Sequence, residues 1–455
     1  MQQGIRGRLK AGIRKILPNR VVRYLQQYRQ LQADARWIDQ VVVPCLPDEW
    51  EHRALYERQS RELIAKYRRV ELCQLFSARF GDMIITFYLQ HEFPAKEGEM
   101  VLFIPVGYIY DMEPIYQFLH TEKYIANPVL FYKITEQMPV LTRKNAGFWR
   151  YFITYHRDRI YPSRRFDSFS MQAMNREFIR RKAYRHTYLT FTPEEERKGQ
   201  QELKQMGITG TYVCFFSRTN EYLKKFLHAD VDTDLASLAR NSHIEKFSLM
   251  CERLHKKGIQ SIRMGKFVDA PFTAQGCIDY ASQYYSPFMD LYLSAHAQCF
   301  VADFSAMQLF AALFQKPLVL TNVSVFTMHG DSITYCEWER DILLPKKLYD
   351  TIHQRYLTFR EILEVEKRED LHLKVYAYYE SHGIVYEENT PEEIADATDE
   401  LLERIAGKIE YTQEDISRQE CIRALLNWAT EGRDCFVHDV PIARDFLRNN
   451  PWFLA

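Results

Sequence analysis

The chain has 455 residues, of which 46% are apolar, and its 60 Lys and Arg are balanced by 60 Asp and Glu. This length is typical of two to three domains, and the neutral charge balance argues against a general nucleic-acid binder. The sequence has no apolar run of about 18 residues, no signal-peptide pattern and no CxxC pair among its nine cysteines. We therefore expect a cytoplasmic chain without a transmembrane helix, a zinc site or a disulfide framework.

The first 36 residues form a basic segment in which nine Lys and Arg face a single acid, Asp34. Apolar residues recur at spacings of three and four between Ile5 and Leu17, which predicts a basic amphipathic helix within an N-terminal helical region, 1–69. Such a helix can lie in an anionic membrane surface, where each basic residue adds about 1 kcal/mol. The alternative is a helix docked on the protein's own body with solvated arginines.

A first α/β domain is predicted over residues 70–190, after a charged helical pattern at 51–69. Three short apolar runs in it predict strands, at 83–89, 100–106 and 129–132. Gly107 follows the second run, and residues 114–120 have a helical pattern. The order of strand, glycine turn, helix and strand is typical of a parallel sheet.

A second α/β domain is predicted over residues 191–400. Three apolar runs, each ending at a polar or glycine cluster, predict its central strands at 212–216, 259–262 and 299–302. Thr192-Pro193 and Thr390-Pro391 are each followed by glutamates, which is typical of helix starts, and Gly207 is the predicted C-cap of the first of these helices. The last residues, 401–455, have helical patterns and are predicted to pack back across both domains.

The ends of these strands carry residues suited to an anionic ligand. Arg218 and Arg263 follow the first two strands, and a guanidinium can bind a diphosphate through two parallel hydrogen bonds. Gly265 allows the backbone to turn tightly beside a ligand. Because ligands bind at the carboxyl ends of parallel strands, we expect a nucleotide diphosphate here. The alternatives are a salt bridge to a nearby helix for Arg218 and an interdomain ion pair for Arg263.

The third strand leads into Asp303 and a predicted helix start at Ser305, Ala306 and Met307. Free backbone N–H groups and the Ser305 hydroxyl would form an anion site there. Asp303 either caps this helix or bonds to ribose hydroxyls.

Other predicted contacts lie at neighbouring strand ends. Asp279 and Tyr280 are candidates for a base or ribose contact, with a loop-anchoring role as the alternative for Asp279. Asp290 precedes an apolar helix and is predicted as its N-cap. The predicted donor site comprises Ser217, Arg218, Arg263, Gly265, Asp279, Tyr280, Asp303, Ser305, Ala306, Met307 and Asn322.

No metal or cofactor is expected. The histidines lack a spacing such as HxxxH, and the Asp230-Val231-Asp232 triplet lies in a polar loop before a helix instead of directly after a strand. The absence of GxSxG, Walker A and GxGxxG motifs argues against a hydrolase, an ATPase or a dinucleotide enzyme.

Ten pieces of the chain over about 100–455 resemble, in order, a family of bacterial glycosyltransferases associated with surface-polysaccharide gene clusters. The pieces are Thr190-Phe191-Thr192-Pro193-Glu194-Glu195-Glu196, Phe216-Ser217-Arg218 with Tyr222, Arg240-Asn241-Ser242, Ile262-Arg263-Met264-Gly265, Ile278-Asp279-Tyr280-Ala281, Asp290, Phe314-Gln315-Lys316-Pro317, Asn322, Leu344-Pro345-Lys346-Lys347 and Glu388-Asn389-Thr390-Pro391-Glu392-Glu393-Ile394. Two departures stand out: Gly107-Tyr108 where the family tends to have Gly-His, and Ser305-Ala306 where it usually has a glycine near the serine.

The resemblance implies a GT-B-like fold, with two Rossmann-like domains whose parallel sheets face each other across a cleft. Residues 70–190 would form the acceptor side, and residues 191–400 would hold a nucleotide sugar. The implied reaction is a metal-independent, inverting transfer of the sugar to a glycan or lipid-linked acceptor. Inverting enzymes of this fold carry a catalytic acid or histidine in a strand-end loop of the acceptor domain, and here that loop holds Asp111 and Glu113. The alternative for Glu113 is a dipole partner of the helix that starts at Pro114.

Two other functions stay open from the sequence. A nucleotide-sugar 2-epimerase could use the same double-Rossmann architecture, although such enzymes need carboxylates and a histidine that converge on one sugar. A non-catalytic glycosyltransferase-like subunit is the third reading, and the Gly107-Tyr108 departure supports it.

Overall fold

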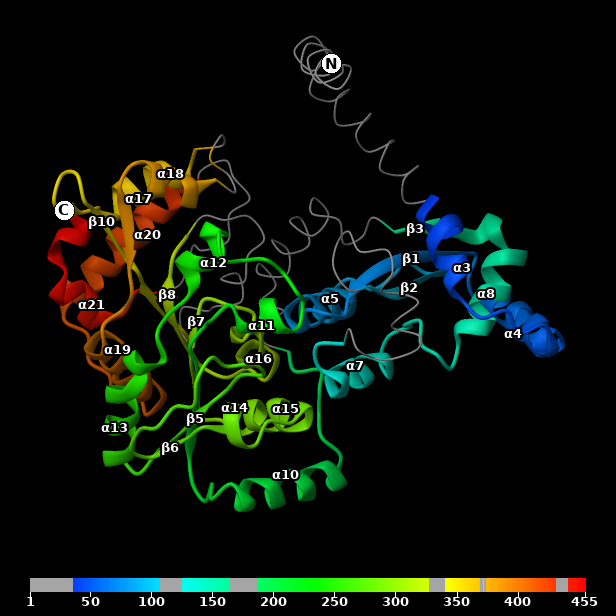
Figure 1. Ribbon diagram of the computed structural model, residues 1–455, viewed down its shortest axis with the longest axis horizontal. Helices are drawn as coiled ribbons and strands as arrows, with labels where there is room; N and C mark the ends of the chain where they lie inside the picture. Colours follow the sequence, from blue (N-terminus) through cyan, green and yellow to red (C-terminus); the bar gives the residue numbers. More distant parts are fainter. Residues whose placement is uncertain are drawn as a thin grey trace, which may run out of the picture. The chain divides into compact units, whose positions relative to one another are not determined.

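The computed structural model describes residues 36–106, 125–163, 186–326, 340–368, 371, 374–430 and 441–455 (Figure 1). The chain divides into two compact units. Unit 1 contains 1–78, 94–126 and 135–166, and unit 2 contains 79–93, 127–134 and 167–455. The contacts thus group two short segments of the predicted first domain, and the predicted C-terminal region 401–455, with unit 2. The basic helix predicted between Ile5 and Leu17 lies outside the described residues.

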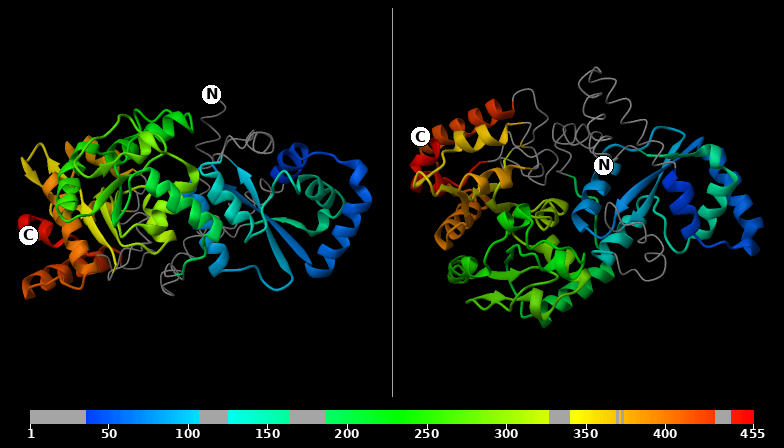
Figure 2. Two further views of the ribbon diagram at one scale, coloured as in Figure 1. Left: turned by 90° about the horizontal axis from the view of Figure 1, so that it is seen from below. Right: turned by 45° about the horizontal axis from the view of Figure 1, so that its top comes forward.

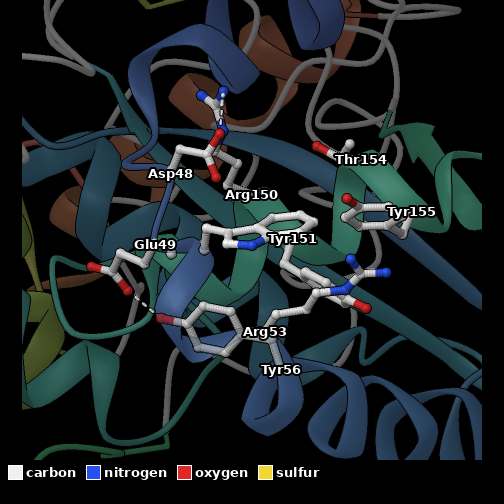
Figure 3. Close-up of a pocket in the computed structure, with 10 residues that line it drawn as sticks. Asp48, Glu49, Arg53, Tyr56, Arg150, Tyr151, Thr154 and Tyr155 are labelled. Carbon is white, nitrogen blue, oxygen red and sulfur yellow. Dashed lines mark hydrogen bonds and ion pairs between the residues drawn. The ribbon is translucent and has the colours of Figure 1, made fainter.

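Unit 1 is built on a parallel sheet with the strand order β2-β1-β3. Val70 of β1 stands opposite Met100 of β2 and Ile160 of β3. Its elements in chain order are η1 (Ile38–Val42), α3 (Val43–Cys45), η2 (Trp50–His52), α4 (Arg53–Lys66), β1 (Arg69–Phe76), β2 (Glu99–Val106), α8 (Ala146–Tyr155), η3 (Arg157–Arg159) and β3 (Ile160–Pro162). The helix predicted at 51–69 is confirmed up to Lys66, although Arg69 is already the first residue of β1, and the strand predicted at 100–106 is confirmed. Tyr56 of α4 contacts Phe148 and Tyr151 of α8 through its ring. Tyr56 and Tyr151 are drawn in Figure 3.

Two predicted strands are helices. Residues 83–89 belong to α5 (Phe80–Glu92), and residues 129–132 belong to α7 (Pro128–Thr135). A short apolar run is compatible with a buried strand or a buried helix, and its periodicity does not separate the two. In α5, which belongs to unit 2, most residues are buried because the helix packs on α16 and the turn before it: the Phe80 ring stacks on Phe310 at 4.8 Å, and a Cβ atom at Gly81 would lie 2.8 Å from Cβ of Ala306.

Unit 2 contains a six-stranded parallel sheet with the order β6-β5-β4-β7-β8-β9. These strands are β4 (Tyr212–Phe216), β5 (Gln260–Arg263), β6 (Cys277–Ile278), β7 (Phe300–Asp303), β8 (Leu318–Val323) and β9 (Ile342–Pro345). The three central strands predicted from apolar runs are confirmed within one residue at each end. A smaller antiparallel sheet has the order β11-β10-β12, from β10 (Lys347–Asp350), β11 (Arg355–Tyr356) and β12 (Ile384–Glu387).

Helices cover both faces of the six-stranded sheet (Figures 1 and 2). On one face, α13 (Ser248–Lys256) packs on β5, and α19 (Pro391–Ile405) packs on β8, β9 and α13. On the other face, α16 (Gln308–Leu313) packs on β7 and β8 beside α15 (Pro287–His296), with α10 (Pro193–Gln205) outside α15. The remaining helices are α11 (Glu221–Lys225), α12 (Leu235–Arg240), η5 (Ile244–Phe247), α14 (Tyr280–Gln283), α17 (Phe359–Glu366), α18 (Val375–Ser381), α20 (Gln413–Thr430), α21 (Arg444–Asn449) and η8 (Pro451–Leu454). The predicted α/β class with parallel sheets is therefore confirmed in both units.

Both predicted helix starts are confirmed as capping boxes, in which the N-cap Thr accepts a bond from the third helical residue and the Glu there bonds back to the Thr. The pairs are Thr192 with Glu195 for α10 and Thr390 with Glu393 for α19. Met206 is the C-cap of α10, and the predicted C-cap, Gly207, follows it with φ of +75°.

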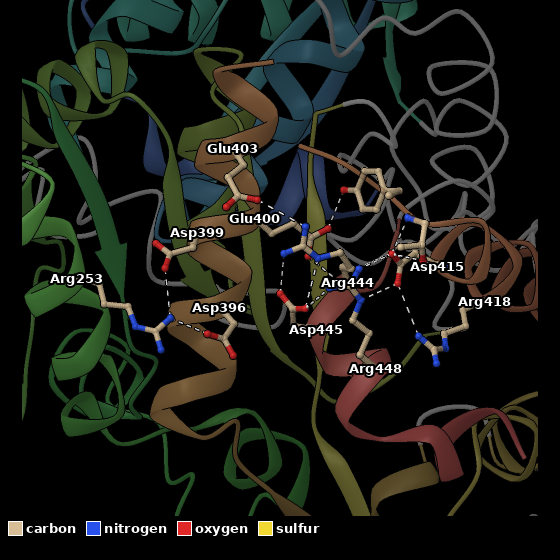
Figure 4. A network of polar contacts seen from close by, with 12 residues as sticks. Arg253, Asp396, Asp399, Glu400, Glu403, Asp415, Arg418, Arg444, Asp445 and Arg448 are labelled. Atoms are coloured by element: carbon tan, nitrogen blue, oxygen red, sulfur yellow. Dashed lines mark hydrogen bonds and ion pairs between the residues drawn. The ribbon is translucent and has the colours of Figure 1, made fainter. Parts of the chain in front are cut away.

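Polar contacts join the C-terminal helices to one another and to α19 within unit 2 (Figure 4). Arg448 of α21 binds both carboxylate oxygens of Asp415 in α20, with Nε–Oδ1 at 2.8 Å and Nη2–Oδ2 at 2.6 Å. The backbone N–H of Arg444 donates to Glu400 of α19 at 2.6 Å. The bidentate bond and the buried Glu400 acceptor hold α20 and α21 against α19.

Candidate functional site

The six-stranded sheet reverses its strand order between β4 and β7. Successive strands run outward on one side through β5 and β6, and on the other through β8 and β9. In open α/β sheets of this order, ligands bind outside the carboxyl ends of the two strands at the reversal. Strand β4 ends at Phe216 and β7 ends at Asp303, so Ser217, Arg218 and Asp303 lie at this switch point.

Arg218 places a buried positive charge at the switch point among uncharged hydrogen-bond partners. Its Nη1 donates to the Ser237 carbonyl at 2.8 Å, to Asn220 Oδ1 at 3.3 Å and to Asn241 Oδ1. Burial, and then the nearby Arg240, lower the pKa of the Arg218 guanidinium to about 10, so the group stays protonated at neutral pH. Within the described part of the chain, no carboxylate bonds to this guanidinium and its Nη2 and Nε make no hydrogen bond, so the predicted alternative of a salt bridge is wrong there.

The side chain of Asp303 links the end of its strand to the neighbouring strand ends through hydrogen bonds. Its Oδ2 accepts from the Arg218 backbone N–H at 2.7 Å and from the Ser242 hydroxyl. Its Oδ1 accepts from Thr321 Oγ1 and Asn322 Nδ2, both at 2.7 Å. The side chain is fully buried, and burial raises the pKa of its carboxyl group. The predicted capping role is wrong, because all four donors come from outside α16. Both carboxylate oxygens are bonded to the protein itself, so the residue stabilises the sheet edge.

Ser217 also stabilises the sheet edge through hydrogen bonds. Its hydroxyl donates to the Ser242 carbonyl at 3.1 Å and lies 2.9 Å from the Ser242 hydroxyl. The loop after α12 is thereby fixed against the end of β4. This contact positions Asn241 to accept from Arg218.

Two more cations lie near Arg218. The buried Lys346, directly after β9, donates from Nζ to the Asn241 carbonyl at 2.7 Å, and Arg240 ends α12 on the other side of that residue. Burial lowers the pKa of the Lys346 amino group. The sheet edge thus concentrates three basic side chains around one asparagine, which favours an anionic ligand.

Asn322 is held by a reciprocal amide pair with Asn389. The Asn322 N–H donates to Asn389 Oδ1 at 2.6 Å, and the Asn389 N–H donates to Asn322 Oδ1 at 3.0 Å. Asn322 has φ of +54°, a left-handed conformation that asparagine tolerates better than most residues. Both residues are fully buried, so they fix the ends of β8 and β12 and leave no side-chain surface for the predicted ligand contact of Asn322.

Arg263 and Asp279 form an ion pair inside unit 2. Arg263 Nη1 lies 3.4 Å from Asp279 Oδ2 and donates to the Ala270 carbonyl at 2.6 Å. The same carboxylate oxygen accepts from the Phe272 N–H at 2.8 Å. The pair therefore anchors the loop between β5 and β6, as in the alternative role predicted for Asp279. The interdomain ion pair considered for Arg263 is wrong, because its partners Asp269 and Asp279 belong to the same unit. Gly265 has φ of +143°, which confirms the tight turn.

The predicted helix start at Ser305, Ala306 and Met307 is a turn. Helix α16 begins at Gln308 and has six residues. The Ser305 hydroxyl accepts from the Met307 N–H at 3.3 Å, and Ala306 is packed against Gly81 of α5. The proposed anion site therefore loses part of its backbone donors to local bonds and packing.

Tyr280 is fully buried. Its hydroxyl lies 2.7 Å from the Ser286 carbonyl and 3.1 Å from Asp290 Oδ1, which leaves no surface for the predicted base or ribose contact. Asp290 is not the N-cap of α15, because Ser286 caps that helix by accepting from the Met289 N–H. Asp290 instead lies inside the helix with Asn127 Nδ2 at 3.5 Å, and burial, opposed by Tyr280 and the charge of Lys266, raises its pKa to about 7.

We expect Asp290 to make unit 2 less stable as the pH rises from 5 to 7. Over this range the folded protein holds a proton that the unfolded chain, with an ordinary aspartate pKa near 3.9, has released. Each pH unit therefore lowers the free energy of unfolding by about 1.4 kcal/mol, which gives a loss of roughly 2–3 kcal/mol between pH 5 and 7. In Asp290→Asn this loss should be absent. Urea unfolding of the wild type and of Asp290→Asn at pH 5 and 7 measures this loss. The exposed Asp230→Asn is the control. Equal pH dependence of the wild type and Asp290→Asn would contradict the raised pKa of Asp290.

The structure brings Ser217, Arg218, Asp303 and Asn322 together at one edge, keeps Arg263 and Asp279 in a separate loop network, and bonds Tyr280 to Asp290. The predicted catalytic residues Asp111 and Glu113 lie outside the described residues. Sequence reasoning missed Asn241 and Lys346 as members of this edge, although both stand in pieces of the chain that carry the family resemblance.

Among the described residues, no group of three or more His, Cys, Asp or Glu side chains is arranged to hold a metal ion. Metal independence stays a prediction. None of the helices in the described ranges combines the length and apolar character needed to cross a membrane.

No protein-family model matches the chain, and no curated protein matches it. Among solved structures, the chain is similar to ADP-heptose LPS heptosyltransferase II of E. coli, with 12% identity over 55% of this chain and 84% of that chain and a TM-score of 0.33. It is similar to a glycosyl transferase family 9 protein of Veillonella parvula DSM 2008, with 12% identity over 74% and 97% of the two chains and a TM-score of 0.37. It is also similar to the wall teichoic acid polymerase TagF, with 10% identity over 85% and 99% and a TM-score of 0.22. At TM-scores this low, these likenesses carry no conclusion about the reaction of this chain.

Proposed function

We propose that this protein is a metal-independent, inverting glycosyltransferase that moves a sugar from a nucleotide-sugar donor to a glycan or lipid-linked acceptor in surface-polysaccharide biosynthesis. One observation carries the proposal: the Arg218 guanidinium lies at the switch point between β4 and β7, bonded through Nη1 alone among described residues and without a carboxylate partner. A permanently charged fork in that place suits the diphosphate of a nucleotide sugar. The family resemblance of the surrounding pieces supports the same reading.

In the proposed reaction an acceptor hydroxyl attacks the anomeric carbon from the face opposite the nucleoside diphosphate. The bond from that carbon to the diphosphate breaks, and the negative charge that develops on the leaving group is stabilised by Arg218. Lys346 and Ser217 hold the loop at Asn241 and thereby position the guanidinium. The proton of the acceptor hydroxyl passes to a carboxylate, for which Asp111 and Glu113 are the candidates.

Binding of a nucleoside diphosphate tests the site. In Arg218→Ala, the affinity for UDP or GDP should fall by roughly 10- to 150-fold, the range for losing a charge-assisted hydrogen bond. Arg218→Lys should restore part of it, because a point charge replaces a planar fork. Calorimetry on folded variants measures both.

The matched control is Arg253→Ala, which removes an arginine from a half-exposed ion pair with Asp396 at 2.6 Å on the outer face. It should leave nucleotide affinity unchanged. Equal affinity of Arg218→Ala and wild type would remove Arg218 from the site. A screen of nucleotide sugars with the wild type then separates the functions: transfer supports the proposal, an isomerised sugar supports an epimerase, and binding without turnover with any acceptor supports a non-catalytic subunit.

The basic segment 1–36 is proposed to hold the enzyme on the inner, anionic face of the cytoplasmic membrane, near a lipid-linked acceptor. Its nine basic residues against one acid provide the charge for such contact. The full chain should sediment with anionic vesicles at low salt, and a chain lacking residues 1–36 should not. Equal sedimentation of the two proteins would indicate that the segment docks on the protein body.

A further inference from the structure

Unit 1 contains a pocket between the start of α4 and helix α8 (Figure 3). Its volume of about 90 Å³ gives room for several water molecules or for one small ring. The described residues that line it all belong to unit 1.

One wall of the pocket is aromatic. Trp50 is 59% exposed and Tyr155 is 48% exposed, although both carry large apolar rings. The Arg53 guanidinium contacts both rings, lying 4.5 Å from the Trp50 ring centroid and 5.7 Å from that of Tyr155. Arg53 therefore holds the two rings in place while their surfaces stay open to solvent, which is typical of a contact site.

The opposite side of the pocket is polar and fixed. Glu49 accepts from the Tyr56 hydroxyl, and burial together with Glu49 raises the pKa of Tyr56 to about 12, so this hydroxyl keeps its proton. A Cβ atom on Gly147 of α8 would overlap with Glu49 Oε2, so only glycine lets the carboxylate lie this close to the helix. Arg150 donates to the carbonyls of Val43 and Leu46, both at 2.9 Å, which ties α8 to the chain before the pocket.

The charges around the pocket cancel. Asp48 and Glu49 are balanced by Arg53 and Arg150, so the formal net charge of the described lining residues is zero. A ligand that fits this pocket has an apolar face for the aromatic rings of one wall and a rim of hydroxyl groups for the charged side chains. A neutral pyranose ring has both, because its axial C–H bonds form the face and its equatorial hydroxyls form the rim.

We propose that this pocket binds one ring of a neutral pyranose chain, with Trp50 and Tyr155 against its C–H face and Glu49 toward its hydroxyls. The inference rests on the proposed function, since a glycan acceptor would bring such a chain to the protein. The pocket would then bind a part of the acceptor chain that lies away from its reacting end.

Three neutral hexasaccharides serve as probes on the full chain: cellohexaose, maltohexaose and chitohexaose in its N-acetylated form. At least one should bind by calorimetry and change the tryptophan fluorescence. Trp50→Ala should weaken that binding by roughly tenfold or more, because the stacking surface is lost. Trp50→Phe should retain part of it.

Two tyrosine variants provide a matched pair. Tyr155→Ala should weaken binding of the same probe, and Tyr132→Ala, which removes a ring that is 43% exposed on α7, should not. Binding of UDP is measured on every variant and should stay at the wild-type value. If the protein binds UDP but none of the three probes, or if Trp50→Ala binds the probe as wild type does, the pocket is not a glycan site and the proposed function stands. If no nucleotide binds while Trp50 still controls probe binding, the proposed transferase function fails and the pocket assignment survives.

Discussion

Asp303→Asn is expected to lower the free energy of unfolding of unit 2 by about 3–5 kcal/mol. The wild-type carboxylate is fully buried and accepts four hydrogen bonds, two on each oxygen. In the asparagine variant one of these acceptors becomes an NH₂ group that faces two donors, in either orientation of the amide. Urea unfolding at pH 7, followed by tryptophan fluorescence and circular dichroism, measures the loss.

Two comparisons make the result interpretable. Thr321→Val removes one of the four donors and should cost about 1 kcal/mol. Asp396→Asn removes a half-exposed carboxylate on α19 and should cost less than about 1 kcal/mol. Unfolding of Asp303→Asn at the wild-type urea concentration would show that the carboxylate does not tie the strand ends together.

Asp111→Asn is expected to reduce turnover by about 10²- to 10⁴-fold while the affinity for the donor barely changes. This expectation rests on the proposed function. A base acts on the acceptor hydroxyl in the transition state, so its loss affects the chemical step more than ground-state binding. Steady-state kinetics with the donor found in the screen measure turnover, and calorimetry with the same donor measures affinity.

The stereochemistry of the product provides a second check on the base. A single displacement assisted by Asp111 gives a product with inverted anomeric configuration, which NMR identifies. Retention of configuration would contradict both the base role and the inverting mechanism. A fully active Asp111→Asn enzyme would transfer the role to Glu113, for which Glu113→Gln is the corresponding variant, or to an acid within 143–185.

These two substitutions probe different contributions to the same proposed site. Asp303 orients the backbone of Arg218 and fixes Ser242, so its replacement should also weaken nucleotide binding. Asp111 should leave that binding intact. A loss of nucleotide affinity in both variants would indicate that the Asn substitution at Asp111 disturbs the fold.

Local sequence was sufficient wherever the stabilising contacts lie within a few residues. Thr192 and Thr390 each form their capping box with a glutamate three positions later, so the start of both helices could be predicted without tertiary information. The strand at 212–216 was likewise bounded by its own apolar run and by the polar residues after it. Since strand order follows from short parallel connections, the placement of Arg218 at a carboxyl edge was also predictable.

Tertiary structure decided the features whose contacts lie far apart in the chain. The run at 83–89 became a helix because its surroundings come from distant elements: the Tyr88 hydroxyl lies within hydrogen-bond distance of the Ala312 and Leu313 carbonyls, more than 220 residues away. Asp290 appeared to be a cap from its position before an apolar run, yet its burial beside Tyr280 and Asn127 makes it a group that titrates near neutrality. Arg263 and Arg218 look equivalent in the sequence, and only the fold shows that Asp279 neutralises the first while no carboxylate among the described residues bonds to the second. Residue types at strand ends thus predict which edge of the sheet carries charged side chains. Burial and pairing across the sheet determine which of these side chains is free of a protein carboxylate and can bind a ligand.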